Sequence, residues 1–104
     1  MLVQLTMFPT TKTDPKASAS ADVAKVIDII DKSGLPYKLG PMSTSIEGDW
    51  DSVMAVVNRA RLMLRRKHQR VYIIMTIDDR KGAHNRITGK IQSVEDKLGR
   101  EVSK

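Results

Sequence analysis

Hydroxyl and carboxylate side chains lie close together in the middle of the sequence. Three hydroxyl residues and one acid fall between positions 43 and 47: Ser43, Thr44, Ser45 and Glu47. Hydroxyls donate and accept hydrogen bonds and an ionised carboxylate accepts them strongly, so such a set can orient a small polar ligand. Each hydroxyl taken alone is best explained as an ordinary strand residue facing water. Taken together with Glu47, they favour a binding site.

A second acidic stretch, Asp78-Asp79-Arg80, follows a strongly apolar segment. Such a run most often stabilises a turn through its aspartate side chains, and a ligand contact is the main alternative. A metal site is the least favoured reading, because adjacent strand residues point to opposite faces and cannot easily bind one ion together. Asp78 is therefore a candidate ligand contact, and no metal site is predicted.

Motifs of catalysis and of cofactor binding are missing from the sequence. The chain has no cysteine, which removes disulfides and thiolate chemistry. His68 and His84 have no serine or carboxylate at a recognisable catalytic spacing, and we interpret both as surface residues. Neither of the glycine-rich phosphate-binding motifs occurs. We therefore predict a protein that is not an enzyme, with no catalytic residues and no cofactor.

The pattern of apolar residues predicts the elements that position these side chains. Strands are predicted at 2–8, 37–40, 42–48 and 71–77, and helices from Asp14-Pro15 to about Ser33, from the capping residue Asp49 onward, and from about Thr88 to Leu98. The order strand, helix, strand, strand, helix, strand predicts an α+β ferredoxin-like β-α-β-β-α-β sandwich with an additional C-terminal helix. Residues 1–104 are predicted to form a single domain.

In this architecture the two main helices cover one face of the sheet and leave the other face open. Side-chain alternation predicts the residues of that open face: Gln4, Thr6, Phe8, Ser43, Ser45, Glu47, Tyr72, Ile74, Thr76 and Asp78. Apolar anchors mixed with hydroxyls and acids are typical of a partly buried pocket or a wet interface. The last strand is an apolar edge strand, so we expect another subunit or the third helix to cover it. Self-association is therefore predicted from patterning alone.

Four segments of the sequence together resemble the small thiamine-binding protein family, once catalogued as an uncharacterised family. They are Gly34 to Gly48 (GLPYKLGPMSTSIEG), Asp51 to Met54 (DSVM), Thr76 to Arg80 (TIDDR) and Gly89 to Val94 (GKIQSV). Members of that family usually carry glycine after the methionine of the first segment, where this chain has Ser43. The added hydroxymethyl group can either crowd a pocket or supply a hydrogen bond.

The resemblance implies a ferredoxin-like domain that binds a thiamine-like molecule, catalyses no reaction and assembles into dimers that pair as tetramers. A carboxylate such as Glu47 or Asp78 can accept a hydrogen bond from the amino group of thiamine or offset its cationic ring. The remaining polar atoms and rings of the ligand would be met by residues nearby in the sequence or on the last strand: Met42, Ser43, Thr44, Ser45 and Tyr72.

The formal net charge of +6 raises the alternative of a nucleic-acid-binding module. Much of this charge lies at and just beyond the end of the second predicted helix: Arg59, Arg61, Arg65, Arg66, Lys67 and Arg70. Cations at that end complement the helix dipole and keep the surface soluble, which we favour over an RNA-binding surface. A purely structural or regulatory homo-oligomer is a third alternative.

The N-terminal segment has neither the basic leading region nor the cleavage site of a secretory signal. No stretch approaches the roughly 20 apolar residues that cross a bilayer. The sequence therefore predicts a cytoplasmic protein without a membrane partner.

Overall fold

The computed structural model describes residues 1–10 and 20–104. Its elements follow in the order β1 (Leu2–Pro9), α1 (Ser20–Lys32), β2 (Tyr37–Leu39), β3 (Thr44–Glu47), α2 (Trp50–Arg65), β4 (Val71–Asp78) and α3 (Arg86–Leu98). This order confirms the predicted α+β ferredoxin-like fold with an additional C-terminal helix. The predicted helix start at Asp14-Pro15 lies outside the described residues. None of the helices in the described ranges is long and apolar enough to cross a membrane.

The four strands form one antiparallel sheet in the order β2-β3-β1-β4. Strand β1 lies at the centre and pairs with β4 along its whole length, from Leu2 opposite Asp78 to Pro9 opposite Val71. On its other side β1 pairs with the shorter β3, with Gln4 opposite Ser45. The register therefore brings β3 and β4, which are distant in sequence, to either side of the same residues of β1.

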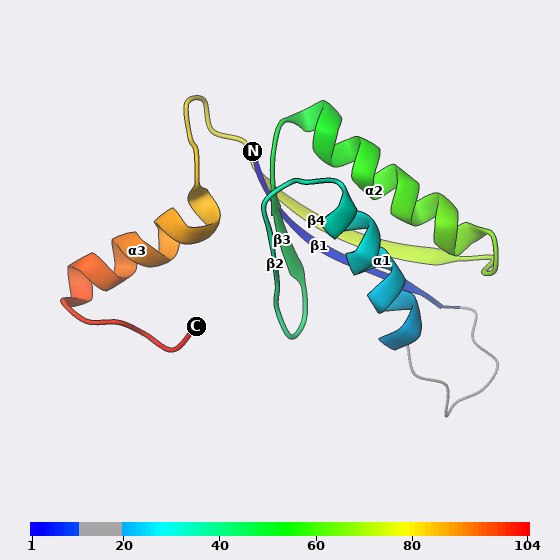
Figure 1. Cartoon of the computed structure of the whole chain (residues 1–104), viewed down its shortest axis with the longest axis horizontal. Helices are drawn as coiled ribbons and strands as arrows, with labels where there is room; N and C mark the ends of the chain where they lie inside the picture. The colour runs from blue at the N-terminus through cyan, green and yellow to red at the C-terminus, as the bar shows by residue number, and fades with distance from the viewer. Residues whose placement is uncertain (11–19) are drawn as a thin grey trace.

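The hydrophobic core lies between the sheet and helices α1 and α2, which run across the same face of the sheet (Figure 1). Strand β1 contributes every second residue to this core, and Val3, Leu5 and Met7 are all buried. Ile46 of β3 and Ile30 of α1 are completely buried. The period of two along β1 and the period of 3.6 along the helices explain which residues meet here. The opposite face of the sheet is left to polar and partly exposed side chains.

The start of α2 and the residues after its end are fixed by polar contacts. Asp49 caps the helix by accepting a hydrogen bond from the N–H of Ser52 at 3.1 Å, as the sequence predicts. His68 was predicted to be a surface residue, and this is wrong: its side chain is only 15% exposed and its Nε2 lies 3.4 Å from Asp22 of α1. The contact exists because α1 and α2 pack side by side, so that the turn after α2 reaches the beginning of α1.

Helix α3 projects away from the sheet instead of lying across it (Figure 1). The spacing of Ile91, Val94 and Leu98 predicts a buried stripe on this helix. That prediction is only partly correct within one chain, because Val94 and Leu98 are each 51% exposed. Ile77, predicted to face the helices, is also 37% exposed because β4 is the edge strand. The helix ends as predicted at Leu98, followed by Gly99 in the left-handed region. Half-exposed apolar side chains thus lie on both α3 and β4.

Candidate functional site

The open face of the sheet carries polar residues in register across its three longer strands. Gln4 of β1 lies between Ser45 of β3 and Thr76 of β4, and one pair further along, Leu2 lies between Glu47 and Asp78. Because side chains alternate along a strand, all six emerge on the side that α1 and α2 do not cover. The predicted placement of Ser45, Glu47 and Asp78 on this face agrees with the register.

A hollow of about 230 Å³ opens on this face, and we call it the open-face pocket. It is lined by residues of all three longer strands and one residue of α3: Leu2, Val3, Gln4, Ser45, Thr76, Asp78 and Lys90. An amide, two hydroxyls, a carboxylate and an ammonium group therefore converge on one space. These groups can both donate hydrogen bonds to a small polar molecule and accept hydrogen bonds from it.

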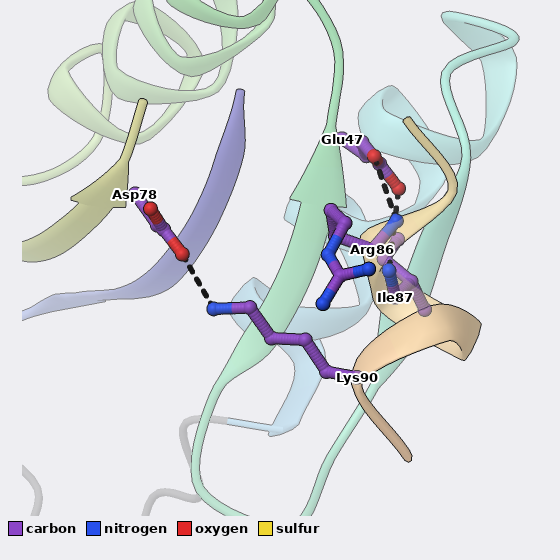
Figure 2. A network of polar contacts seen from close by, with 5 residues as sticks. All are labelled: Glu47, Asp78, Arg86, Ile87 and Lys90. Carbon is purple, nitrogen blue, oxygen red and sulfur yellow. Dashed lines mark hydrogen bonds and ion pairs between the residues drawn. The ribbon is translucent and has the colours of Figure 1, made fainter. Parts of the chain in front are cut away.

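Lys90 reaches from α3 to the carboxylate of Asp78, with 2.5 Å between Nζ and Oδ2 (Figure 2). The hydrogen bond and the charge of Lys90 lower the pKa of Asp78 below its ordinary value, and Arg80 and Arg86 add to this effect. The pair is about half exposed, so water screens it and its contribution to stability is small. Its main effect is to keep Asp78 ionised beside the open-face pocket.

Glu47 has a structural role that sequence reasoning did not find. Its carboxylate accepts hydrogen bonds from the N–H of Arg86 at 2.9 Å and the N–H of Ile87 at 3.3 Å (Figure 2). Asn85, the residue at the capping position, has a left-handed φ of 54° and makes no side-chain cap hydrogen bond within the described residues. Glu47 therefore caps α3 from the end of β3. The buried carboxylate, only 9% exposed, positions α3 and hence Lys90.

The other predicted site residues lie away from the open-face pocket. Thr44 is buried on the helix-covered side of the sheet, opposite Leu5. Met42, Ser43 and Thr44 all line a different hollow of about 280 Å³, between α1, β1 and the turn that joins β2 to β3. Ser43 nevertheless touches the open face, because its Oγ accepts a hydrogen bond from Nε2 of Gln4 at 2.8 Å.

Tyr72 lies at the far end of β4 from Asp78. It pairs with Phe8, and the centroids of the two rings are 5.6 Å apart. Six residues of strand separate Tyr72 from Asp78, which corresponds to about 20 Å. Within one chain, Ser45 and Asp78 are the only two of the predicted ligand-binding residues that line the open-face pocket. Tyr72 lies at a distance from it.

Sequence reasoning did not name Gln4, Thr76 or Lys90 as site residues, although all three line the pocket. Gln4 and Thr76 were placed on the correct face by alternation. The register adds them to the site, because Gln4 pairs with Ser45 on one side and with Thr76 on the other. The available signal for Lys90 was its place in the segment Gly89 to Val94, one of the four that carry the family resemblance. Among the described residues, no cluster of histidine, aspartate and glutamate could hold a metal ion.

The family model described as Thiamine-binding protein matches residues 3–95 of this chain. The chain belongs to the thiamine-binding protein family. The match covers every residue of the open-face pocket except Leu2, together with Glu47 and the two amides that it caps. The segments that shape the site therefore lie almost entirely within the range that the family model matches.

Relatives of this thiamine-binding family protein agree with the assignment. A UPF0045 protein of Mycobacterium bovis is 39% identical over 74 residues, which are 70% of this chain and 72% of that protein. A solved structure of a hypothetical protein from Methanocaldococcus jannaschii has a TM-score of 0.80 at 27% identity, covering 91% of this chain and 95% of that one. A Thermotoga maritima protein, provisionally described as a thiamine biosynthesis or salvage protein, shares the fold with a TM-score of 0.75 at 22% identity, covering 89% and 96%.

Proposed function

We propose that this protein binds thiamine, or a related pyrimidine or thiazole compound, in the open-face pocket and catalyses no reaction on it. The observation that carries this proposal is the family match over residues 3–95, which encloses a polar hollow on the uncovered face of the sheet. We also propose that the protein is cytoplasmic and acts as a homo-oligomer, a dimer of dimers, in which the open face of one subunit meets another.

The lining of the pocket matches the polar groups of thiamine. Asp78 can accept a hydrogen bond from the amino group of the pyrimidine, since a carboxylate keeps free acceptor positions beside Lys90. The hydroxyls of Ser45 and Thr76 and the amide of Gln4 can each donate to a ring nitrogen or accept from the hydroxyethyl tail. The side chain of Leu2 supplies apolar area. Affinity would come from the apolar contacts, and orientation from the polar ones.

The size of the pocket supports an oligomeric site. Its volume of about 230 Å³ is below the roughly 300–1,000 Å³ of pockets that enclose a drug-sized ligand. Further along the same face of β4 lie half-exposed apolar side chains, Ile74 at 51% and Tyr72 at 42%, which a partner surface would cover. A second subunit packed on this face would close the hollow and bury these residues together.

The chemistry of the pocket supports binding without catalysis. The ordinary pKa of an aspartate already lies far below neutral pH, and Lys90 lowers that of Asp78 further, so this carboxylate is ionised near neutral pH and cannot serve as a general acid there. The described lining contains no histidine, and its carboxylate, Asp78, is paired with Lys90 and not with the hydroxyl of Ser45 or Thr76. The pocket can therefore hold a ligand but offers no group poised to transfer a proton.

Isothermal titration of the protein with thiamine tests the proposal. We expect saturable binding that weakens when the pocket is altered by Ser45→Ala and by Asp78→Asn. Ser52→Ala, an exposed position on α2, which covers the other face of the sheet, lies outside the lining. It is the matched control for the first change and should leave affinity unchanged. If wild-type protein shows no heat of binding with thiamine or its pyrimidine half, the proposal is wrong.

The alternative of nucleic-acid binding has less support from the structure. Two cations at the end of α2 already serve local contacts, because Arg61 binds Oδ1 of Asn58 at 2.7 Å and Arg65 donates to the carbonyl of Gln69 at 2.9 Å. Filter binding of generic RNA at two salt concentrations separates the two proposals, since phosphate contacts weaken steeply with salt. A purely structural homo-oligomer would show no small molecule retained in native mass spectrometry.

A further inference from the structure

The loop between β4 and α3 forms a strongly cationic hollow beside the open-face pocket. It measures about 390 Å³ and is lined by Arg80, Lys81, Gly82, Ala83, His84 and Arg86. Its lining is mostly polar and contains no carboxylate among the described residues. Three permanent cations and a histidine thus surround one space, an arrangement that repels cationic ligands and attracts anions.

The three cations of this hollow make no direct ion pair with an acidic side chain of the described residues. Within residues 1–10 and 20–104, Arg80, Lys81 and Arg86 make no ion pair, although three carboxylates lie near them in the fold. Asp78 is engaged by Lys90, and Glu47 is engaged by the amides of α3. The remaining acid, Asp79, is exposed and pairs with none of them. Their charge is therefore available to a ligand.

The loop has a defined shape. The N–H of Ala83 donates to the carbonyl of Arg80 at 3.2 Å, which closes a turn, and Gly82 adopts the left-handed φ of 76° that this turn requires. At the other end of the loop, Glu47 holds the backbone of Arg86. Both ends of the hollow are therefore fixed before any ligand arrives, which reduces the entropy lost on binding.

The cationic hollow and the open-face pocket are neighbours. Asp78 and Lys90 line the pocket, while Arg80 and Arg86 line the hollow. Arg80 follows Asp78 by two residues along the chain, and Arg86 precedes Lys90 by about one turn of α3, or roughly 6 Å along the helix axis. The positive charges of Arg80 and Arg86 also lower the pKa of Asp78, which places them within electrostatic reach of its carboxylate.

We infer that this loop binds the phosphate group of a phosphorylated ligand whose organic part occupies the open-face pocket. The inference rests on the proposed function and names the form of the ligand: a phosphate ester of the thiamine type, in preference to the free alcohol. Arginine and lysine donate charge-assisted hydrogen bonds to phosphate oxygens. A free thiamine molecule, which is itself a cation, gains nothing from Arg80, Lys81 and Arg86 and is repelled by them.

Calorimetric titration with thiamine, thiamine monophosphate and inorganic pyrophosphate tests this inference. We expect wild-type protein to bind the monophosphate at least about tenfold more tightly than thiamine, as one or more charge-assisted hydrogen bonds are added. The double variant Arg80→Ala/Lys81→Ala should lose this preference. The control double variant Arg66→Ala/Lys67→Ala removes two exposed cations from the end of α2 and should keep it.

The three ligands separate failure of the inference from failure of the proposed function. If thiamine binds and the phosphate adds no affinity, or if the preference survives in Arg80→Ala/Lys81→Ala, the phosphate site is refuted and thiamine binding stands. Pyrophosphate that binds to wild-type protein and not to Arg80→Ala/Lys81→Ala would support the anion site. If, in addition, neither thiamine compound binds better than pyrophosphate, the anion site stands and the proposal of thiamine binding is wrong. Binding of none of the three refutes both.

Discussion

Glu47 and Arg86 connect the sheet to the C-terminal helix: the carboxylate of Glu47 accepts the N–H of Arg86 at 2.9 Å, across 39 positions of sequence. A second bond, from the N–H of Ile87, makes Glu47 the cap of α3. Two N–H groups at the start of a helix that would otherwise lack partners are satisfied by a residue from another element. The direction in which α3 leaves the sheet therefore depends on one buried side chain.

Removal of the Glu47 carboxylate should loosen α3 without unfolding the sheet. We expect Glu47→Ala to cost about 1–3 kcal/mol of stability, because two buried amides lose their acceptor. Glu47→Gln, which keeps one acceptor oxygen, should cost less. Hydrogen exchange measured by NMR should show the amides of Arg86 and Ile87 exchanging faster, while that of Leu5 stays protected. Glu101→Ala, at an exposed position, is the control. Unchanged exchange at Arg86 in Glu47→Ala would contradict the capping role.

The ion pair of Asp78 with Lys90 should be visible in a pH titration. The pKa of Asp78 is lowered from 3.8, chiefly by Lys90, so carboxyl NMR should find its midpoint below that value. The pKa of Asp78 is lower in the folded chain than in the unfolded chain. The pair therefore stabilises the fold fully at pH values above the unfolded pKa, and this stabilisation is lost as the pH falls through the folded pKa. Lys90→Met should raise the midpoint, and Lys97→Met, further along α3, should leave it unchanged. An identical midpoint in wild type and Lys90→Met would show that the pair does not form in solution.

The acid titration should also release the C-terminal tail from α3. Glu95 accepts hydrogen bonds from Nζ of Lys104 at 2.7 Å and from the N–H of Val102 at 2.9 Å, and both lower its pKa below 4.5. At pH values above the unfolded pKa of Glu95, its ionised carboxylate holds the tail. The tail is released as the pH falls through the lower folded pKa of Glu95. Relaxation of the Val102 amide should show increased motion as Glu95 becomes protonated, at a pH below 4.5. Glu95→Gln should show that motion already at pH 7, and a tail equally rigid in Glu95→Gln would refute this role.

Ile74 should contribute to self-association and not to folding. Its side chain is 51% exposed on the open face, so Ile74→Lys removes little buried area within one chain. Leu62→Lys, at a position 47% exposed on α2, is the matched control. Sedimentation velocity should show that Ile74→Lys dissociates the oligomer, whereas Leu62→Lys does not, with unchanged circular dichroism for both. If both variants sediment as wild type does, the open face is not the interface.

Side-chain alternation predicted much of this molecule, because it depends only on local geometry. The rule turns Val3 inward and Gln4 outward on β1, and the structure agrees. On β3 it likewise turns Ile46 inward and Ser45 outward. Applied strictly, the same rule places Thr44 on the covered side, so its inclusion among the predicted ligand contacts did not follow from the pattern. The element order and the cap at Asp49 were likewise local signals.

The position of α3 could not be predicted, because it depends on a contact between residues distant in sequence. Nothing around Glu47 indicates that its carboxylate will cap a helix that begins at Arg86. As long as the position of α3 is unknown, the sequence gives no neighbour for Lys90 and does not predict its ion pair with Asp78. The open-face pocket needs the register of β3 and β4 across β1 as well as this helix. Each of these conditions is a property of the assembled fold.

The central place of β1 in the sheet has a consequence for how the chain is made. Leu2 and Asp78, which face each other in the finished sheet, are 76 positions apart, so Leu2 leaves the ribosome well before Asp78 does. At about 5–20 residues per second, β1 waits several seconds for its long partner strand. During this interval the side of β1 that later pairs with β4 has no partner strand, and pairing between segments so distant in sequence is of the kind that closes late in folding.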